Sequence, residues 1–144
     1  MSISDRLRII FSVKETPRKI ALAFAMGVFI GISPFLGLHT LMAIGFASIF
    51  RLNKLVTLAG AFITNPWTII PIYSFATWIG IKMTGHESTL SQTNFKEITI
   101  VNIFSILKEL ILPFFVGTMC FGLIAGAVSY IFVYSIMKRM RRAA

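Results

Sequence analysis

The stretch GISPFLGLHT, residues 31–40, interrupts the apolar run that decides the fold of this chain. The 31 residues of the range 20–50 include no Asp, Glu, Lys or Arg. As one straight helix they would be ~46 Å long at 1.5 Å per residue, whereas the hydrocarbon core of a bilayer is ~30 Å thick. A break at Ser33-Pro34 leaves two pieces that are each too short for a crossing, which needs ~20 residues. We therefore predict a re-entrant helical hairpin that enters and leaves the membrane on one side.

The composition indicates an integral membrane protein. Hydrophobic residues make up 56% of the 144 residues, and the mean hydropathy of +0.83 is well above soluble usage. A net charge of +9 would suggest a nucleic-acid partner in a soluble protein. Here the basic residues cluster at positions 6–19 and 138–142, beside apolar runs, which is the pattern of topology signals. We expect the lipid bilayer as a partner and no nucleic acid.

The other apolar runs complete an all-α fold class. Residues 1–15 have the pattern of an amphipathic helix on the bilayer surface. Residues 55–81 are a second uncharged run, broken at Pro66 and Pro71 because both prolines cannot lie inside one regular helix. After the interfacial helix, we predict one membrane domain, 16–137, and a basic tail at 138–144. The domain begins with a broken hairpin at 20–50 and a broken segment at 55–81 that either crosses or re-enters. A polar loop and interfacial helix at 82–109 and a transmembrane helix at 114–136 complete it.

The distribution of Lys and Arg decides between two topologies, because cytoplasmic segments carry the excess of positive charge. Three plain spans would leave eight basic residues on one side and six on the other. The hairpin returns Arg51 and Lys54 to the side of both termini, which gives eleven against three. The sequence thus predicts a multi-pass protein of the cytoplasmic (inner) membrane with both termini in the cytoplasm.

Both breaks begin with a residue pair that is typical of helix starts. Ser33 precedes Pro34, Asn65 precedes Pro66, and the two pairs are 32 residues apart. Each pair suits an N-cap followed by a first-turn proline. Each break would then start a half-helix whose N-terminal amides point into the membrane interior, as in the substrate sites of transporters. The alternative is that the prolines only kink a bundle in which neighbouring helices satisfy the freed backbone groups. The spacing also suggests an internal repeat.

The candidate binding residues lie at the breaks and in the polar turn after residue 50. His39 is either a relay or ligand group or a partner for a freed carbonyl. Arg51 either snorkels to the interface or binds an anionic lipid headgroup, and Asn65 either contacts a ligand or caps a helix. The set proposed to contact a substrate or lipid is Ser33, Pro34, His39, Thr40, Arg51, Asn53, Asn65, Pro66 and Tyr73, of which Tyr73 also suits an interfacial aromatic belt.

Two glycine pairs and the scarcity of acidic residues add further expectations. Gly27 with Gly31 and Gly122 with Gly126 predict close helix packing, within one chain or between copies. No Asp or Glu occurs between positions 16 and 86, whereas hydrolytic sites need paired carboxylates, an activated nucleophile or a metal. Cys120 stands alone in an apolar run. We expect no enzyme activity, no cofactor and no metal site.

The sequence resembles a family of bacterial membrane proteins catalogued as domain of unknown function 2062. The matching pieces are AFAMGVFIGISPFLGLHT, FRLN, TNPWTIIPIY and LPFFVGTMCFGLIAG, within residues 16–134. Members often differ at Leu36, and many have glutamine where His39 stands. The resemblance implies a membrane protein and names no substrate. The positions shared with the family are Gly27, Gly31, Pro34, Gly37, Arg51, Asn53, Asn65 and Pro66.

Two functions of different classes remain open from the sequence. In the first, the broken segments form a polar site at the membrane midplane that binds or passes a small solute or a lipid headgroup, in a homo-oligomer. In the second, the protein is a membrane scaffold or an assembly partner in the cell envelope, and the breaks only lock its fold.

Overall fold

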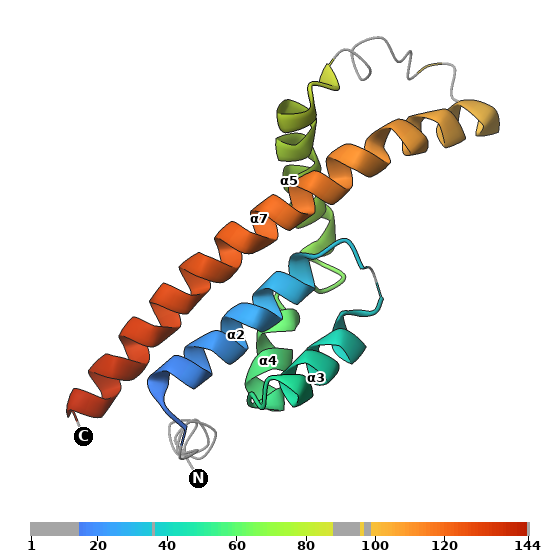
Figure 1. Cartoon of the computed structure of the whole chain (residues 1–144). Coiled ribbons are helices and arrows are strands. Elements are labelled where there is room, and N and C mark those ends of the chain that lie inside the picture. The colour runs from blue at the N-terminus through green and yellow to red at the C-terminus, as the bar shows by residue number, and fades with distance from the viewer. Residues whose placement is uncertain (1–14, 36, 88–95, 97–98, 144) are drawn as a thin grey trace.

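The computed structural model describes residues 15–35, 37–87, 96 and 99–143, and the fold of these residues is all-α (Figure 1). Five α-helices and no strand occur among them: α2 Pro17–Ile32, α3 His39–Ile49, α4 Lys54–Ala61, α5 Ile69–Thr84 and α7 Ile100–Ala143. The predicted fold class is confirmed at this level. The amphipathic helix predicted for residues 1–15 lies outside the described residues, apart from residue 15.

Helices α2 and α3 form a hairpin over the range in which we predicted one. Thr16 starts α2, since its Oγ1 accepts a hydrogen bond from the Lys19 amide at 3.3 Å and Pro17 takes a first-turn position. α3 then returns to the end of the molecule at which α2 begins (Figure 1). A buried cluster there joins the start of α2, the end of α3, the turn into α4 and the end of α7: Ile20, Ala23, Ala47, Leu52, Val56 and Met137.

Residues 55–81 are broken, as predicted. α4 ends at Ala61 and α5 begins at Ile69, so the break covers residues 62–68. Pro71 is the third residue of α5, where its missing N–H loses no helical acceptor. α5 ends at Thr84, and Gly85 after it has a φ of 74°, which suits glycine. Residues 82–84 therefore belong to α5 and not to the predicted polar loop.

Helix α7 corrects the prediction for the C-terminal part of the chain. We predicted an interfacial helix before residue 109 and a separate transmembrane helix at 114–136, whereas one helix of 44 residues runs from Ile100 to Ala143 and takes in most of the predicted basic tail. Pro113 lies inside α7 and costs it a backbone hydrogen bond. Its side chain is fully buried, so packing around the proline offsets the lost bond. At 1.5 Å per residue α7 is ~66 Å long.

Glycine lets helix backbones touch where α2 crosses α4. A Cβ added to Gly27 of α2 would lie 2.0 Å from the carbonyl oxygen of Thr57 in α4, a distance that no side chain tolerates. Gly31 meets the end of α4 one turn later, and Gly122 and Gly126 of α7 face α2. All four glycines that we predicted to pack helices therefore lie at helix crossings within the chain.

The outer surface of the described helices is apolar. Large hydrophobic side chains are exposed on each of them, including Leu22 of α2, Leu41 and Ile49 of α3, Leu55 of α4 and Ile70 of α5, and α7 continues the pattern. In the described part of the chain one helix, 102–143, is long and apolar enough to cross a membrane. The surface and this helix indicate association with a membrane.

Candidate polar site at the helix breaks

The two breaks meet in the interior of the molecule. The Tyr73 hydroxyl of α5 donates a hydrogen bond of 3.1 Å to the carbonyl oxygen of Ser33, at the end of α2. Ser33 is 1% exposed and Tyr73 is 9% exposed. Gly31, two residues before the first break, touches Ala61, the residue before the second. The end of α2 and the start of α5 thus share one buried hydrogen bond between positions 40 residues apart.

The first break differs from its prediction, because Ser33 caps the end of α2 and not the start of α3. The Ser33 amide donates to Phe29 O at 2.9 Å, and its Oγ donates to Ile30 O at 2.6 Å. Ser33 therefore closes the C-terminus of α2 and does not start α3, so the N-cap prediction for Ser33 is wrong. A serine side chain reaches backward to a carbonyl three residues earlier as readily as forward to an amide. Half-buried Pro34 follows in the bend, and α3 starts only at His39.

At the second break Asn65 caps a turn, whereas α5 itself begins at Ile69 after Thr68 and has no side-chain cap. Asn65 Oδ1 accepts hydrogen bonds from the amides of Trp67 at 3.0 Å and Thr68 at 3.1 Å. Thr68 Oγ1 in turn accepts from the Asn65 amide at 3.0 Å and donates to Ile63 O at 2.6 Å. This reciprocal pair is a capping box, and exposed Pro66 takes the first position of its turn. Asn65 thus caps the turn that leads into α5.

Two side-chain atoms at the breaks have unused hydrogen-bonding capacity. Thr64 is 3% exposed, and its Oγ1 has no hydrogen-bond partner among the described residues. The buried Nδ1 of His39, at the start of α3, has none there either. The N-terminus of α3 lacks a side-chain cap, and Thr40 is exposed in its first turn. A buried hydroxyl without a partner costs ~1–3 kcal/mol, so both groups could serve a polar ligand or water.

Arg51 and Asn53 lie at the opposite end of α4 from these groups. Arg51 is exposed and has a left-handed φ of 54°. Asn53 Oδ1 caps α4 by accepting from the amides of Leu55 at 3.0 Å and Val56 at 3.3 Å. The structure therefore separates the predicted binding residues into two groups. Ser33, Pro34, Asn65 and Pro66 belong to the breaks, and His39, Thr40 and Tyr73 lie in the first turns of the helices that follow them; Arg51 and Asn53 belong to the turn between α3 and α4.

Sequence reasoning missed three hydroxyl groups in or near the breaks. Thr68 carried a signal, since its position three residues after Asn65 is that of a capping box. Thr64 and Thr118 carried none. Thr118 of α7 is fully buried, and its Oγ1 donates to Phe114 O at 2.7 Å. The ring of Phe114 in turn meets the Tyr73 ring edge to face at 5.3 Å.

The chemistry of the break region is that of neutral hydrogen-bonding groups. It offers hydroxyls, an imidazole and backbone amides, and its sequence contributes no carboxylate. In the described part of the chain, no three His, Cys, Asp or Glu side chains lie close enough together to hold a metal ion. Half-buried Cys120 is a free thiol. Such a set suits the binding of an anionic or carbonyl group.

Comparison with known proteins identifies the family of the chain. No curated protein and no solved structure matches it. A family model described as an uncharacterized protein conserved in bacteria matches residues 2–144, which is nearly the whole chain. The resemblance seen in the glycine, proline and RLN motifs is thereby confirmed. The chain belongs to the bacterial family catalogued as domain of unknown function 2062.

Proposed function

We propose that this chain is a non-catalytic, multi-pass inner-membrane protein whose two helix breaks form a polar site inside the bilayer, where a small solute or a lipid headgroup binds or passes. The observation that carries the proposal is the buried hydrogen bond between Tyr73 and Ser33. Backbone that leaves the helix at membrane depth is tolerated only where it is buried in protein or lines a wet cavity. The contact between the end of α2 and the start of α5 meets this requirement, because it buries the broken backbone in protein.

Helix lengths support the membrane placement. α2 and α3 have 16 and 11 residues, or ~24 Å and ~16 Å, and neither crosses a ~30 Å core alone. From Lys19 to Ser33 the chain rises ~21 Å along α2, and less along the membrane normal where the helix is tilted. With Lys19 at the interface, the first break then lies in the hydrocarbon core, within ~6 Å of its midplane. α4 and α5 together run from one end of the molecule to the other (Figure 1), which favours a crossing over a re-entrant segment for residues 55–81.

The ends of the molecule support an orientation with both termini in the cytoplasm. The buried cluster of Ile20, Ala47 and Met137 brings the turn holding Arg51 to the start of α2 and the end of α7. The Arg141 guanidinium also donates to the carbonyl oxygen of Glu15 at that end. Basic residues thus gather at one end, and cytoplasmic segments carry such an excess. In this orientation Arg51 is placed to meet an anionic lipid headgroup.

The unpartnered groups at the breaks support binding over a purely structural role. In hydrocarbon an unsatisfied polar group costs several kcal/mol, so Thr64 Oγ1 and His39 Nδ1 would retain water or a ligand. A single chain with so few crossings would not enclose a path, and we include a homo-oligomer in the proposal. The rival function, a scaffold or assembly partner, is favoured by the capping box of Asn65 and Thr68, which satisfies its break internally.

Thiol accessibility separates the two functions. In a Cys120→Ala background, Thr64→Cys should react with a small membrane-impermeant thiol reagent if the breaks are wet. Ala47→Cys, in the fully buried cluster, is the dry control, and exposed Thr99→Cys is the reactive one. An inert Thr64→Cys in folded, lipid-embedded protein whose Thr99→Cys variant reacts would overturn the binding site and favour the scaffold.

A further inference from the structure

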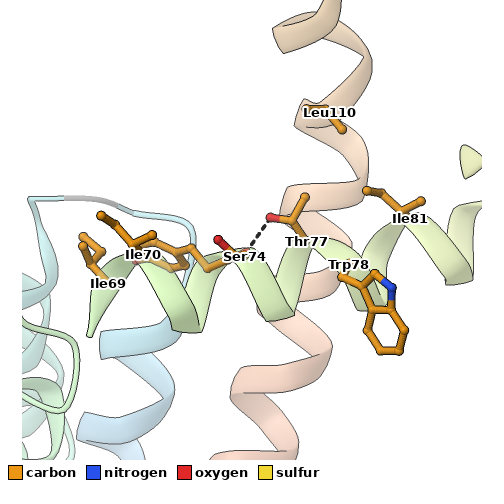
Figure 2. A pocket seen from close by; sticks show the side chains of 8 residues that line it. Ile69, Ile70, Ser74, Thr77, Trp78, Ile81 and Leu110 are labelled. Carbon is orange, nitrogen blue, oxygen red and sulfur yellow. Dashed lines mark hydrogen bonds between the residues drawn. The ribbon is translucent and has the colours of Figure 1, made fainter. Parts of the chain in front are cut away.

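An open groove of about 580 Å³ runs along α5, beside the N-terminal part of α7. Figure 2 shows its wall on α5 and Leu110 on α7. The lining on α5 follows helical spacing and includes Ile70, Ser74, Thr77, Trp78 and Ile81. Thr77 Oγ1 donates to Tyr73 O at 2.6 Å, so that hydroxyl is occupied within the helix. The lining is therefore mostly apolar, as in a site for a hydrocarbon chain.

The two ends of the groove have different chemistry. Its inner end lies at the first turn of α5, directly after the capped break, and Tyr73, which also lines it, reaches Ser33. At its outer end the Lys82 ammonium lies 5.1 Å from the ring centre of Trp78. Tryptophan and lysine together mark a membrane–water interface. The groove thus leads from the interface to the breaks.

The length of the groove matches one leaflet of a bilayer. From Ile69 to Ile81 α5 rises ~18 Å, whereas half of the hydrocarbon core is ~15 Å. An acyl chain that starts at the interface would therefore end beside the breaks. Lys82 is 53% exposed, and its partner Glu87, 3.5 Å away, is 64% exposed. An ion pair this exposed contributes little stabilising free energy, so a lipid phosphate can take the place of Glu87 beside Lys82.

We propose that this groove binds one acyl chain of an anionic phospholipid, with the lipid phosphate at Lys82. The inference rests on the membrane placement proposed above, and it puts the lipid in the non-cytoplasmic leaflet because Lys82 lies at the end opposite the basic one. Trp78 provides the probe. The chain has two tryptophans, and Trp67 is 90% exposed, so Trp67→Phe leaves Trp78 as the single fluorophore without disturbing the core.

The test reconstitutes Trp67→Phe protein in phosphatidylcholine vesicles that contain increasing fractions of either brominated phosphatidylglycerol or brominated phosphatidylcholine. If the groove holds the lipid, quenching of Trp78 should reach half of its maximum at a fraction of the anionic lipid that is about two- to fivefold lower than the corresponding fraction of phosphatidylcholine. This factor is the range expected for an exposed charge pair. Lys82→Gln should abolish the difference between the two lipids. Ser74→Phe should fill the groove and weaken quenching by both lipids. Ser135→Phe, at a serine that is also exposed but lies on α7 away from the groove lining, should change nothing.

Two results would overturn the inference, and they separate it from the placement on which it rests. Equal quenching by both lipids in proportion to their fraction, unaffected by Ser74→Phe, would mean that Trp78 meets only bulk lipid, and the groove would be discarded while the membrane placement stands. Quenching by neither lipid at any fraction would mean that α5 lies outside the bilayer, and both proposals would fail.

Discussion

At the scale of single residues, the junction of the two breaks depends on the Tyr73 hydroxyl. It joins α5 to the end of α2 through the Ser33 carbonyl. Tyr73→Phe keeps the ring and its contact with Phe114 but removes the donor. Because a buried acceptor then loses its partner, we expect the free energy of unfolding to fall by about 1–3 kcal/mol, measured as a lower Tm in detergent.

The control for this change is Tyr130→Phe. Tyr130 lies on α7, half-buried and stacked on Tyr134 at 6.0 Å, and carries no hydrogen bond between the breaks. Its replacement should shift the Tm by much less. Equal shifts for the two variants would contradict a specific role of Tyr73 at the junction. If the polar site binds a solute or headgroup, Tyr73→Phe should also weaken that binding, because Tyr73 fixes the relative position of the two breaks.

At the scale of elements, length and proline placement predicted the breaks but not their caps. Residues 20–50 are too long for one crossing and too short for two, and this argument alone led to the hairpin. The role of Ser33 could not be predicted, since its hydroxyl suits the end of one helix as well as the start of the next. The continuity of α7 through Pro113 depends on packing against α5. A sequence shows no such tertiary contact.

The candidate site was predictable only residue by residue. Ser33, Asn65 and Tyr73 were each named from local patterns, but the contact between Ser33 and Tyr73 joins positions 40 residues apart. It forms because α2 approaches α4 at Gly31, and α4 places the second break beside the first. The buried hydroxyl of Thr64 has no sequence signal at all, because its burial follows from this approach.

The crossing of α5 and α7 offers a test at this scale. A Cβ on Gly80 would lie 1.7 Å from Pro113 O, so Gly80→Ala must push the two helices apart. We expect a loss of about 1–3 kcal/mol or more in the free energy of unfolding, the usual range for overpacking. Gly45→Ala in α3 is the matched control, since a Cβ there meets nothing within 4 Å. Alanine's helix propensity should stabilise that variant by up to ~1 kcal/mol. A Gly80→Ala protein as stable as Gly45→Ala would contradict the crossing.

At the scale of the whole molecule, the start of α2, the end of α7 and the turn between α3 and α4 lie at one end, and the end of α5 lies at the other (Figure 1). The end with the termini carries Arg18, Lys54 and residues 138–142, and the hairpin gives it eleven of the fourteen basic residues. The shape places these segments at one end, and the charge count is the basis on which we propose that this end is the cytoplasmic one. Since the sequence alone supplied the charge count, the structure adds the geometry that lets one side hold all of these segments.

Reporter insertions test this orientation in cells. A reporter inserted at Asn53 and one fused to the C-terminus should both give cytoplasmic signals, whereas one inserted after Gly85 should give an external signal. The physical reason is that in the proposed placement α2 and α3 together return the chain to its starting side, and α4 with α5 then makes the first complete crossing. The control replaces Arg51 and Lys54 with glutamine, which reduces the charge excess of that side and should weaken the cytoplasmic signal at Asn53 without moving the C-terminus. An external signal at Asn53 would mean that residues 20–50 cross the membrane, and the hairpin placement would be wrong.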